Sequence, residues 1–302
     1  INCTLTDADG EEIGIAFTHG ETVAFPVAAP VLWNAEQPYL YTLTLQAGAE
    51  TIEQKVGIRT ISVEDGKILI NGKQVKFRGV NRHDSNPYTG AAVTREDVIR
   101  DLQLMKESNV NAIRTSHYPN APYFPELCSE YGFYMIAEAD LESHGVGTLY
   151  TNDGHDCMGY IAQDDAWAES ILDRQKRNVI RDKNQSAVIF WSLGNESGYG
   201  GNFEDAGRWV KAYDPTRLLH YEASIYDSAG YHNDVSMLDV MSRMYADTEW
   251  VKEYCEDRRM RKPFIQCEFI HAMGNGKYTL KAVRRSKNGW GNAGVNDTTA
   301  PF

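Results

Sequence analysis

Two glutamates stand directly after apolar, strand-like segments of this sequence, a common position for acid–base groups. Glu196 lies in WSLGNESGYG (191–200), where an apolar run ends in Asn-Glu and passes into a glycine-rich turn. A carboxyl group that is partly removed from water favours its protonated form, which is what a general acid requires. The alternative that the motif leaves open is a glutamate that only caps the following helix.

Glu268 is the second such residue and lies in PFIQCEFIHAMGNG (263–276). The two glutamates follow the fourth and the seventh strand-like segments, which face each other if those segments close a barrel. Two carboxyl groups about 5–5.5 Å apart suit a retaining glycoside hydrolysis, with one as nucleophile and the other as acid and then base. Asn195, beside the first glutamate, is placed to hydrogen-bond a sugar hydroxyl. A single glutamate after a strand is often structural, but a pair on these two strands is harder to explain in that way.

The segment AEADLESHG (137–145) contains a pattern that suits a cation. Glu142 and His144 are two residues apart, so in an extended loop both side chains can point to one side. A carboxylate and an imidazole in this arrangement can share a hard divalent ion. A solvated loop that happens to contain a histidine is the alternative, and spacing alone does not decide between them.

Three further side chains follow strand-like segments. His83 in RHDSNP (82–87) and His117 in RTSHYPN (114–120) are either substrate contacts or structural histidines. Tyr245 could donate a hydrogen bond to the nucleophile carboxylate, or it could be a core residue. The residues leave each of these choices open.

Short apolar segments alternate with longer helical ones after residue 62, and this alternation predicts parallel strands joined by helices. Seven such units favour a (β/α)8 TIM barrel over a doubly wound sheet. The expected strands are 75–83, 111–117, 132–140, 187–195, 217–223, 235–245 and 263–269. The expected helices are one that begins at N-cap Thr94 with Asp97 in a capping box, then 122–131, 164–183, 202–213 and 247–259.

Polar residues gather at the C-terminal ends of these strands, where barrel enzymes place their chemistry. They are His83, His117, Glu138, Asp140, Asn195, Glu196, Glu222, Tyr245 and Glu268. Their positions were not used to assign the strands, so the clustering supports the barrel independently. No apolar strand follows residue 276, which predicts either a barrel that lacks strand 8 or an unrelated tail.

The first 62 residues are expected to be β-structure. IGIAF, TVAFPV, LYTLTLQA and TIEQKVGIRTI are rich in β-branched and aromatic residues, with Gly, Pro and Asp between them. About four strands are fewer than the roughly seven of a complete sandwich. We therefore predict a partial β-sandwich over 1–62, an incomplete barrel over 63–276 and a tail of different character over 277–302.

Composition limits the functional class. Hydrophobic residues make up 42% and charged residues 24%, which is an ordinary globular composition. A net charge of −12 argues against nucleic acid as a partner, and no apolar run approaches the roughly 20 residues that cross a bilayer. The five cysteines form no CxxC pair and no signal peptide is visible, so we expect a reduced, cytoplasmic protein. The absence of an initiator Met suggests a piece of a longer chain.

Five motifs together resemble a known family. NRHDSNP, RTSHYPN, EADLESHG, WSLGNESGYG and CEFIHAMGNG, in this order, are similar to the barrel of glycoside hydrolase family two β-galactosidases. LWNAEQPYLYTL followed by GIRTI resembles the end of the immunoglobulin-like β-sandwich domain that precedes that barrel. The resemblance covers roughly residues 30–276.

The resemblance implies a role for each matching residue and a small-molecule β-galactoside such as lactose as substrate. Glu196 is similar to the acid/base and Glu268 to the nucleophile of a retaining enzyme. Tyr245 is similar to the tyrosine that assists the nucleophile. The implied magnesium ligands are Glu142, His144 and Glu196, and the implied substrate contacts are His83, His117, Asn195 and His271. A sodium ion is also expected in the family, but its ligands cannot be located in this sequence.

The sequence departs from the family in two places. Phe269-Ile270 replaces the usual Tyr-Ala, and the strand-8 segment with its aromatic sugar-binding residues does not follow Gly276. Two alternatives to β-galactoside hydrolysis therefore remain open. The chain is a catalytically incomplete or inactive fragment, or it has another activity of the family such as β-glucuronidase. The oligomeric state is open, with a homo-oligomer of the full-length form as one expectation.

Overall fold

Seven parallel strands form the inner wall of the larger part of the molecule, as the strand–helix alternation predicted. The computed structural model describes residues 1–302 except 19–21, 150–158, 227–231, 258–260 and 271–302. Five strands form one sheet in the order β12-β11-β10-β9-β8, and two form the pair β13-β14. They are β8 (Gly79–Asn81), β9 (Ala112–Arg114), β10 (Tyr134–Glu138), β11 (Val188–Ser192), β12 (Leu218–His220), β13 (Met241–Met244) and β14 (Phe264–Glu268).

The strands of the described residues do not close a barrel. Backbone N–H groups of Asp239 and Val240 donate to the Leu219 carbonyl at 2.9 and 3.3 Å, which links the chain before β13 to β12. Among the described residues, no strand pairs with both β14 and β8, and the segment on which the predicted absence of strand 8 rests lies outside them. The predicted tail over 277–302 lies outside the described residues.

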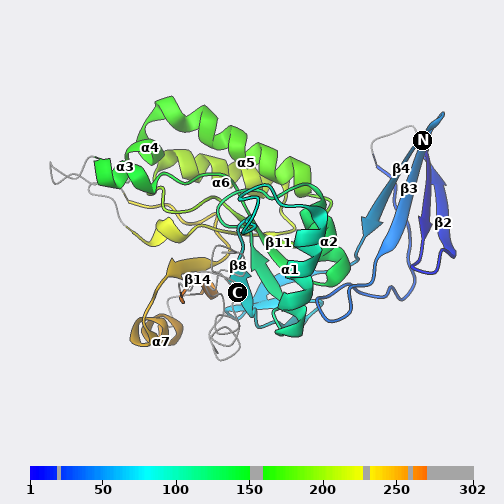
Figure 1. Ribbon diagram of the computed structural model, residues 1–302, viewed down its shortest axis with the longest axis horizontal. Coiled ribbons are helices and arrows are strands. Elements are labelled where there is room, and N and C mark those ends of the chain that lie inside the picture. Colours follow the sequence, from blue (N-terminus) through cyan, green and yellow to red (C-terminus); the bar gives the residue numbers. More distant parts are fainter. Residues whose placement is uncertain (19–21, 150–158, 227–231, 258–260, 271–302) are drawn as a thin grey trace.

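Helices follow the strands and cover the outside of the sheet (Figure 1). They are α1 (Arg95–Glu107), α2 (Tyr123–Tyr131), α3 (His144–Leu149), α4 (Gly159–Gln163), η2 (Asp165–Trp167), α5 (Ala168–Asp182), α6 (Gly201–Tyr213), η3 (Glu222–Ile225) and α7 (Thr248–Glu256). The predicted capping box of α1 is confirmed. Thr94 Oγ1 accepts from the Asp97 N–H at 3.2 Å, and the Asp97 carboxylate accepts from the Thr94 N–H at 2.9 Å. In the described ranges, no helix has the length and apolar character needed to cross a bilayer.

The central strands are buried on both faces because helices pack outside and side chains fill the inside. All five residues of β10 and all five of β11 are buried. A near-continuous apolar run of this kind is typical of parallel strands enclosed by helices. The last residue of each of these two strands is polar, and it lies at the strand end where the site is found.

The N-terminal part forms a separate antiparallel sheet of four strands, seen at one end of the molecule in Figure 1. Its order is β2-β1-β3-β4, with β1 (Asn2–Thr6), β2 (Glu12–Phe17), β3 (Tyr41–Ala47) and β4 (Glu50–Val56). Ile15 and Phe17 are 66% and 60% exposed, so one face of β2 has no apolar cover among the described residues, as expected of a partial sandwich.

One predicted strand is wrong. TVAFPV (22–27) forms no strand, and the fourth place in the sheet is taken by β1, which the sequence analysis did not single out. Pro26 explains part of the error, because proline has no N–H to offer a strand ladder. A small three-stranded sheet of β5 (Ile61–Glu64), β6 (Lys67–Ile70) and β7 (Lys73–Gln74) then leads into the barrel.

Two parts of the N-terminal region, the segment before β3 and the end of β4, are anchored on the barrel by buried contacts. Trp33 is fully buried, and its indole N–H donates to the Ser129 carbonyl at 2.9 Å. Ser186 binds the backbone directly after β4, because its Oγ accepts from the Gly57 N–H at 2.6 Å. Gly132, at the C-terminal end of α2, has φ +77° and lies directly against the Ala35 carbonyl.

This close approach predicts that Gly132→Ala strongly destabilises the protein. An added Cβ would overlap the Ala35 carbonyl oxygen, which is backbone and cannot turn away. Gly72 is the matched control, because its φ is +71° but no atom lies within reach of an added Cβ. In urea unfolding we expect Gly72→Ala to cost about 1 kcal/mol, from strain alone, and Gly132→Ala about 3 kcal/mol or more. Equal costs would contradict the packing described.

Candidate active site

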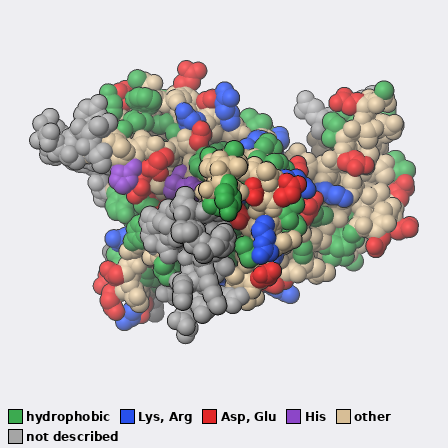
Figure 2. Space-filling view, in the orientation of Figure 1, with side chains coloured by type: hydrophobic (Ala, Val, Ile, Leu, Met, Phe, Trp, Pro, Cys, Tyr) green, Lys and Arg blue, Asp and Glu red, His purple; other side chains and the backbone are tan. Residues whose placement is uncertain are grey.

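The described residues that the sequence singled out lie together at the C-terminal ends of the barrel strands, and histidine and acidic side chains are neighbours on this face of the molecule (Figure 2). His83 follows β8, His117 follows β9, and Glu142 and His144 follow β10. Asn195 and Glu196 follow β11, Tyr245 follows β13, and Glu268 ends β14. His271 lies outside the described residues.

Each carboxylate oxygen of Glu268 accepts a hydrogen bond from a neighbouring side chain. Arg114 Nη1 donates to Oε1 at 2.9 Å, and the Tyr245 hydroxyl donates to Oε2 at 2.7 Å. The Tyr245 N–H also donates to the Glu268 carbonyl at 2.7 Å, which joins the end of β13 to β14. Tyr245 is 48% exposed, so the alternative that it is a core residue is wrong. The carboxylate of Glu268 is therefore fixed in one orientation.

Arg114 is the residue that the sequence analysis missed. Its guanidinium is fully buried and donates to acceptors at the ends of four other strands. Nε donates to Glu138 Oε2 at 2.6 Å, and Nη2 donates to Asn195 Oδ1 at 2.8 Å. Burial by itself would raise the pKa of Glu138, but the adjacent Arg114 and His117 outweigh it and lower that pKa. The signal for Arg114 was present: a charged residue ends an otherwise apolar strand, NAIR (111–114).

The two predicted histidines lie next to each other. His117 Nδ1 is 2.8 Å from Glu138 Oε1, and its Nε2 is 3.9 Å from Glu268 Oε1. The ring centroids of His83 and His117 are 5.4 Å apart in an edge-on arrangement. Burial is the main cause that lowers the pKa of His83, and the neighbouring His117 and Arg114 lower it further. His83 is therefore a neutral imidazole near pH 7, able to bind an uncharged hydroxyl group.

Glu196 stands on a tight turn after β11 with φ +37°. Its N–H donates to Glu222 Oε1 at 2.8 Å. Its Oε2 lies 3.4 Å from Asn195 Nδ2, and that same amide group also donates to Glu142 Oε2 at 2.5 Å. The following helix, α6, begins at N-cap Gly200 and has no side-chain cap. The alternative that Glu196 only caps that helix is therefore wrong.

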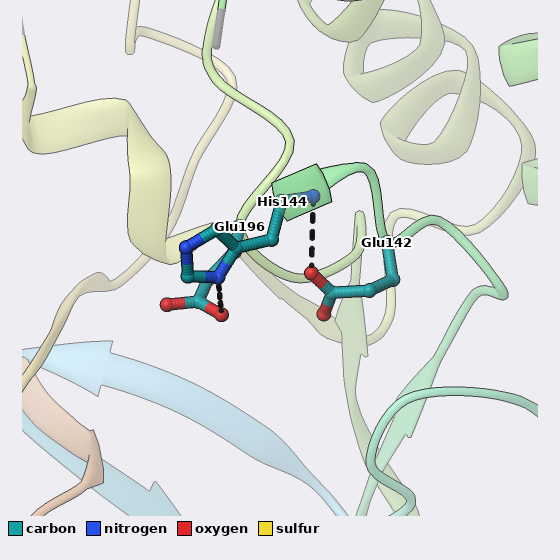
Figure 3. Close-up of side chains that lie close together, drawn as sticks. All are labelled: Glu142, His144 and Glu196. Carbon is teal, nitrogen blue, oxygen red and sulfur yellow. Dashed lines mark hydrogen bonds and ion pairs between the residues drawn. The ribbon is translucent and has the colours of Figure 1, made fainter. Parts of the chain in front are cut away.

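Glu142, His144 and Glu196 form a cluster that could hold a cation (Figure 3). One ligand atom of each lies within 4.8 Å of the others. His144 Nδ1 is 2.7 Å from Glu196 Oε2, and the His144 N–H donates to Glu142 Oε1 at 3.3 Å. The hydrogen bond with Glu196 raises the pKa of His144. Two carboxylates and one imidazole suit a divalent cation, so these residues fit the magnesium ion that the family resemblance implied.

Two titratable groups are buried below this cluster. Burial raises the pKa of Glu222 to about 8, although the Glu196 N–H bound to its carboxyl opposes the shift. His220 is two residues earlier, and burial, followed by the charge of Arg114, lowers its pKa to about 3. His220 Nδ1 is 2.9 Å from Ser242 Oγ. Both groups are therefore neutral in the folded protein near pH 7.

The family of the chain follows from comparison with known proteins. The family model "Glycosyl hydrolases family 2, TIM barrel domain" matches residues 61–287, and the model "Glycosyl hydrolases family 2" matches residues 4–59. The chain belongs to glycosyl hydrolase family 2. The matches divide it near residue 60, between the N-terminal sheet and the barrel, and the barrel match extends past Gly276.

Relatives of the chain are named β-galactosidases. One from Actinobacillus pleuropneumoniae is 51% identical over 265 residues, which cover 81% of this chain and 26% of that protein. One from Staphylococcus xylosus is 44% identical over 281 residues, which cover 93% of this chain and 28% of that protein. The chain thus spans about a quarter of the length of these curated relatives.

Solved structures support the fold. The β-D-glucuronidase of Dictyoglomus thermophilum has a TM-score of 0.73 and 24% sequence identity over 90% of this chain and 50% of that chain. A Ruminococcus gnavus β-glucuronidase has a TM-score of 0.75 and 21% identity over 98% of this chain and 57% of that chain. At this level of identity the likeness shows the architecture, a family 2 barrel preceded by a β-sheet domain.

The buried histidine predicts a specific dependence of stability on pH. Because the folded protein holds His220 neutral, only the unfolded chain takes up a proton as pH falls below about 6.5. The contribution that neutral His220 makes to the unfolding free energy is complete above that pH, and it is lost as pH falls toward 3. Between pH 7 and pH 5 the wild type should lose about 2 kcal/mol more unfolding free energy than His220→Gln, which keeps a polar group near Ser242. Parallel losses in urea titrations at the two pH values would contradict this prediction.

Proposed function

We propose that the protein containing this chain hydrolyses terminal β-D-galactosides, such as lactose, with retention of anomeric configuration. One structural observation supports the chemistry. Hydrogen bonds run from Glu268 through Arg114 to Asn195 and the Glu196 side chain, which brings both carboxyl groups to one cluster of strand ends. The identity of 51% with a named β-galactosidase supports the choice of sugar.

In the first step Glu268 attacks the anomeric carbon while Glu196 gives a proton to the glycosidic oxygen. Arg114 and Tyr245 orient the attacking carboxylate, because each binds one of its oxygens. The bond from the anomeric carbon to the leaving oxygen breaks, and a galactosyl ester of Glu268 forms. The aglycone leaves with the proton that Glu196 supplied.

In the second step Glu196, now ionised, takes a proton from water as the water attacks the anomeric carbon. The ester bond to Glu268 breaks and galactose leaves. The Tyr245 hydroxyl and the Arg114 guanidinium again bind the carboxylate, now as the leaving group. Both glutamates return to their starting protonation states, so the reaction needs no further reagent.

His83, His117 and Asn195 are proposed to bind the hydroxyl groups of the sugar. His83 and His117 are neighbours, and His117 is near Glu268, which places both imidazoles beside the attacking group. The Asn195 amide is already bound, since its oxygen accepts from Arg114 and its NH2 group donates to Glu142, so binding the sugar would require one of these hydrogen bonds to be exchanged. The predicted contribution of His271 stays a prediction.

A divalent cation, magnesium in the first instance, is proposed to bind Glu142, His144 and Glu196. The support is the set of donor types and their separation of no more than 4.8 Å. A bound cation would supply a fixed positive charge beside the acid/base group. No residue is assigned to a sodium ion, and a cytoplasmic location and a homo-oligomeric full-length form stay predictions.

Two alternatives can be tested with the same assays. β-Glucuronidase activity is less favoured, because the glucuronidase structures share only 21–24% identity with the chain, whereas the named β-galactosidases share 44–51%. Initial rates with galactoside, glucuronide and mannoside substrates distinguish these activities. A 302-residue chain that binds galactose but turns over none of them would instead support the catalytically incomplete alternative.

Replacing the nucleophile is the direct test of the mechanism. Glu268→Gln keeps the size of the side chain but removes the negative charge, so kcat for an aryl β-galactoside should fall by more than about 10³-fold. Glu130→Gln is a matched control, because Glu130 lies exposed on α2, and its kcat should equal that of the wild type. Mass spectrometry with a slowly released 2-fluoro galactoside should show the sugar attached to Glu268. Residual hydrolysis within tenfold of the wild type would exclude Glu268 as nucleophile.

Removing the metal should lower activity reversibly. A chelator is expected to reduce kcat/KM, and added Mg²⁺ should restore it. Glu142→Gln should weaken Mg²⁺ binding, measured by calorimetry, by about 10-fold or more, because one charged ligand is lost. Glu130→Gln should bind Mg²⁺ as the wild type does. Chelator-treated protein that keeps full activity and binds no Mg²⁺ would rule out the proposed site.

A further inference from the structure

Glu222 is an acidic residue at the site that the proposed mechanism does not use. It is the first residue of η3, two residues after the end of β12, and it is 1% exposed. One carboxyl oxygen, Oε1, accepts the Glu196 N–H at 2.8 Å. The other oxygen, Oε2, is buried and has no hydrogen-bond partner among the described residues. Among the described residues, the hydrogen bond from the Glu196 N–H is therefore the polar contact that this buried carboxyl makes.

The backbone that Glu222 binds is in an unfavourable conformation. Glu196 has φ +37°, in the left-handed region, between Gly194 at φ +142° and Gly198 at φ +67°. A non-glycine residue in this region is strained by about 1–3 kcal/mol, and it persists only where its surroundings hold it. The turn itself forms no regular ladder that could do so, because β11 ends at Ser192.

Three successive N–H groups of this turn are instead bound by other segments. The Asn195 N–H donates to the Leu141 carbonyl at 2.8 Å, and the Ser197 N–H donates to the Tyr221 hydroxyl at 3.2 Å. The Glu196 N–H between them donates to Glu222. Two of the three acceptors thus come from adjacent residues of one segment, and the carboxyl is the one bound to the strained residue.

We propose that Glu222 is a positioning residue that fixes the backbone of Glu196, and through it the direction in which the Glu196 carboxyl points. This inference rests on the proposed role of Glu196 as acid/base. Loss of the Glu222 acceptor should therefore impair the steps in which Glu196 transfers a proton, but it should not impair the attack by Glu268.

Two substitutions distinguish the loss of the hydrogen-bond acceptor from the loss of side-chain volume. Glu222→Gln keeps an oxygen for the Glu196 N–H, and its NH2 group replaces an oxygen that has no partner among the described residues. Glu222→Met keeps the length but has no oxygen. Glu204→Met is the matched control, because Glu204 is also a buried glutamate that accepts a backbone N–H, from Asp234 at 2.8 Å.

The kinetic test compares leaving groups. With lactose, whose leaving group needs a proton, kcat/KM of Glu222→Met should fall by about 10–100-fold. With a dinitrophenyl β-galactoside, whose leaving group needs none, kcat/KM should change by less than about 3-fold. Added azide should raise kcat of Glu222→Met with the dinitrophenyl substrate, because azide attacks the galactosyl ester without a general base. Glu222→Gln should behave as the wild type, and Glu204→Met should affect both substrates equally.

Hydrogen exchange of the Glu196 amide gives a measurement that needs no activity. The amide should be protected in the wild type and in Glu222→Gln, and should exchange at least about 10-fold faster in Glu222→Met. Fast exchange in the wild type itself would overturn the proposed contact, even if Glu222→Met did not fold. Equal losses of kcat/KM with both substrates would show that Glu222 serves only folding. If the exchange pattern holds but no galactoside is hydrolysed, the positioning contact stands and the proposed function fails.

Discussion

The structure of the site depends on one buried cation, the guanidinium of Arg114. It donates to Glu138 on β10, to Glu268 on β14 and to Asn195 after β11, and it lies 3.3 Å from Asn81 Oδ1 on β8. A charge that is fully removed from water is tolerated only when its donors are all occupied. Removing one partner from such a group costs about 3–5 kcal/mol. The hydrogen bonds that stabilise the buried cation therefore also fix the ends of four different strands relative to one another.

This constraint extends to the rest of the site through the partners of Arg114. One carboxylate oxygen of Glu138 accepts from Arg114, and the other is bound to His117. The orientation of the imidazole therefore depends on that of the guanidinium. Asn195 passes the constraint on by donating to Glu142. The cluster that suits a cation and the histidines near Glu268 are thus parts of one hydrogen-bonded network.

Much of the architecture was predictable from the sequence, because parallel strands enclosed by helices are apolar on both faces. The seven strands were found on this signal, each longer than the structure has it, since the polar residues at the strand ends belong to turns. The strand over 22–27 was wrong, because a short β-rich segment with Pro26 has the right composition without the N–H groups that a ladder needs. Strand β1 was missed, because NCTLT is short and only weakly patterned.

For the site, the sequence indicated which residues lie at the strand ends but not what they bind. Glu196 and Glu268 stood out because each glutamate ends an apolar run. Arg114 ends a run as well, but a buried arginine is recognisable only once its carboxylate partners, 24 and 154 residues away, are known. The contact between Glu222 and the Glu196 N–H is of the same kind, since no local pattern marks a side chain that binds the backbone of a distant turn.

The surroundings of the two carboxyl groups are consistent with the different roles proposed for them. The Glu268 side chain is 6% exposed and faces a permanent cation on one oxygen and a phenol on the other. Its negative charge is compensated and its direction is fixed, which suits a nucleophile. The Glu196 side chain is 30% exposed and contacts an amide and an imidazole, neither of which is a permanent charge. In the proposed mechanism Glu196 gives and takes its proton from this more open position, beside the charge that a bound cation would supply. Because the asymmetry arises from Arg114 binding only one of the two, exchanging the roles would require the buried guanidinium to move, and its other partners prevent that.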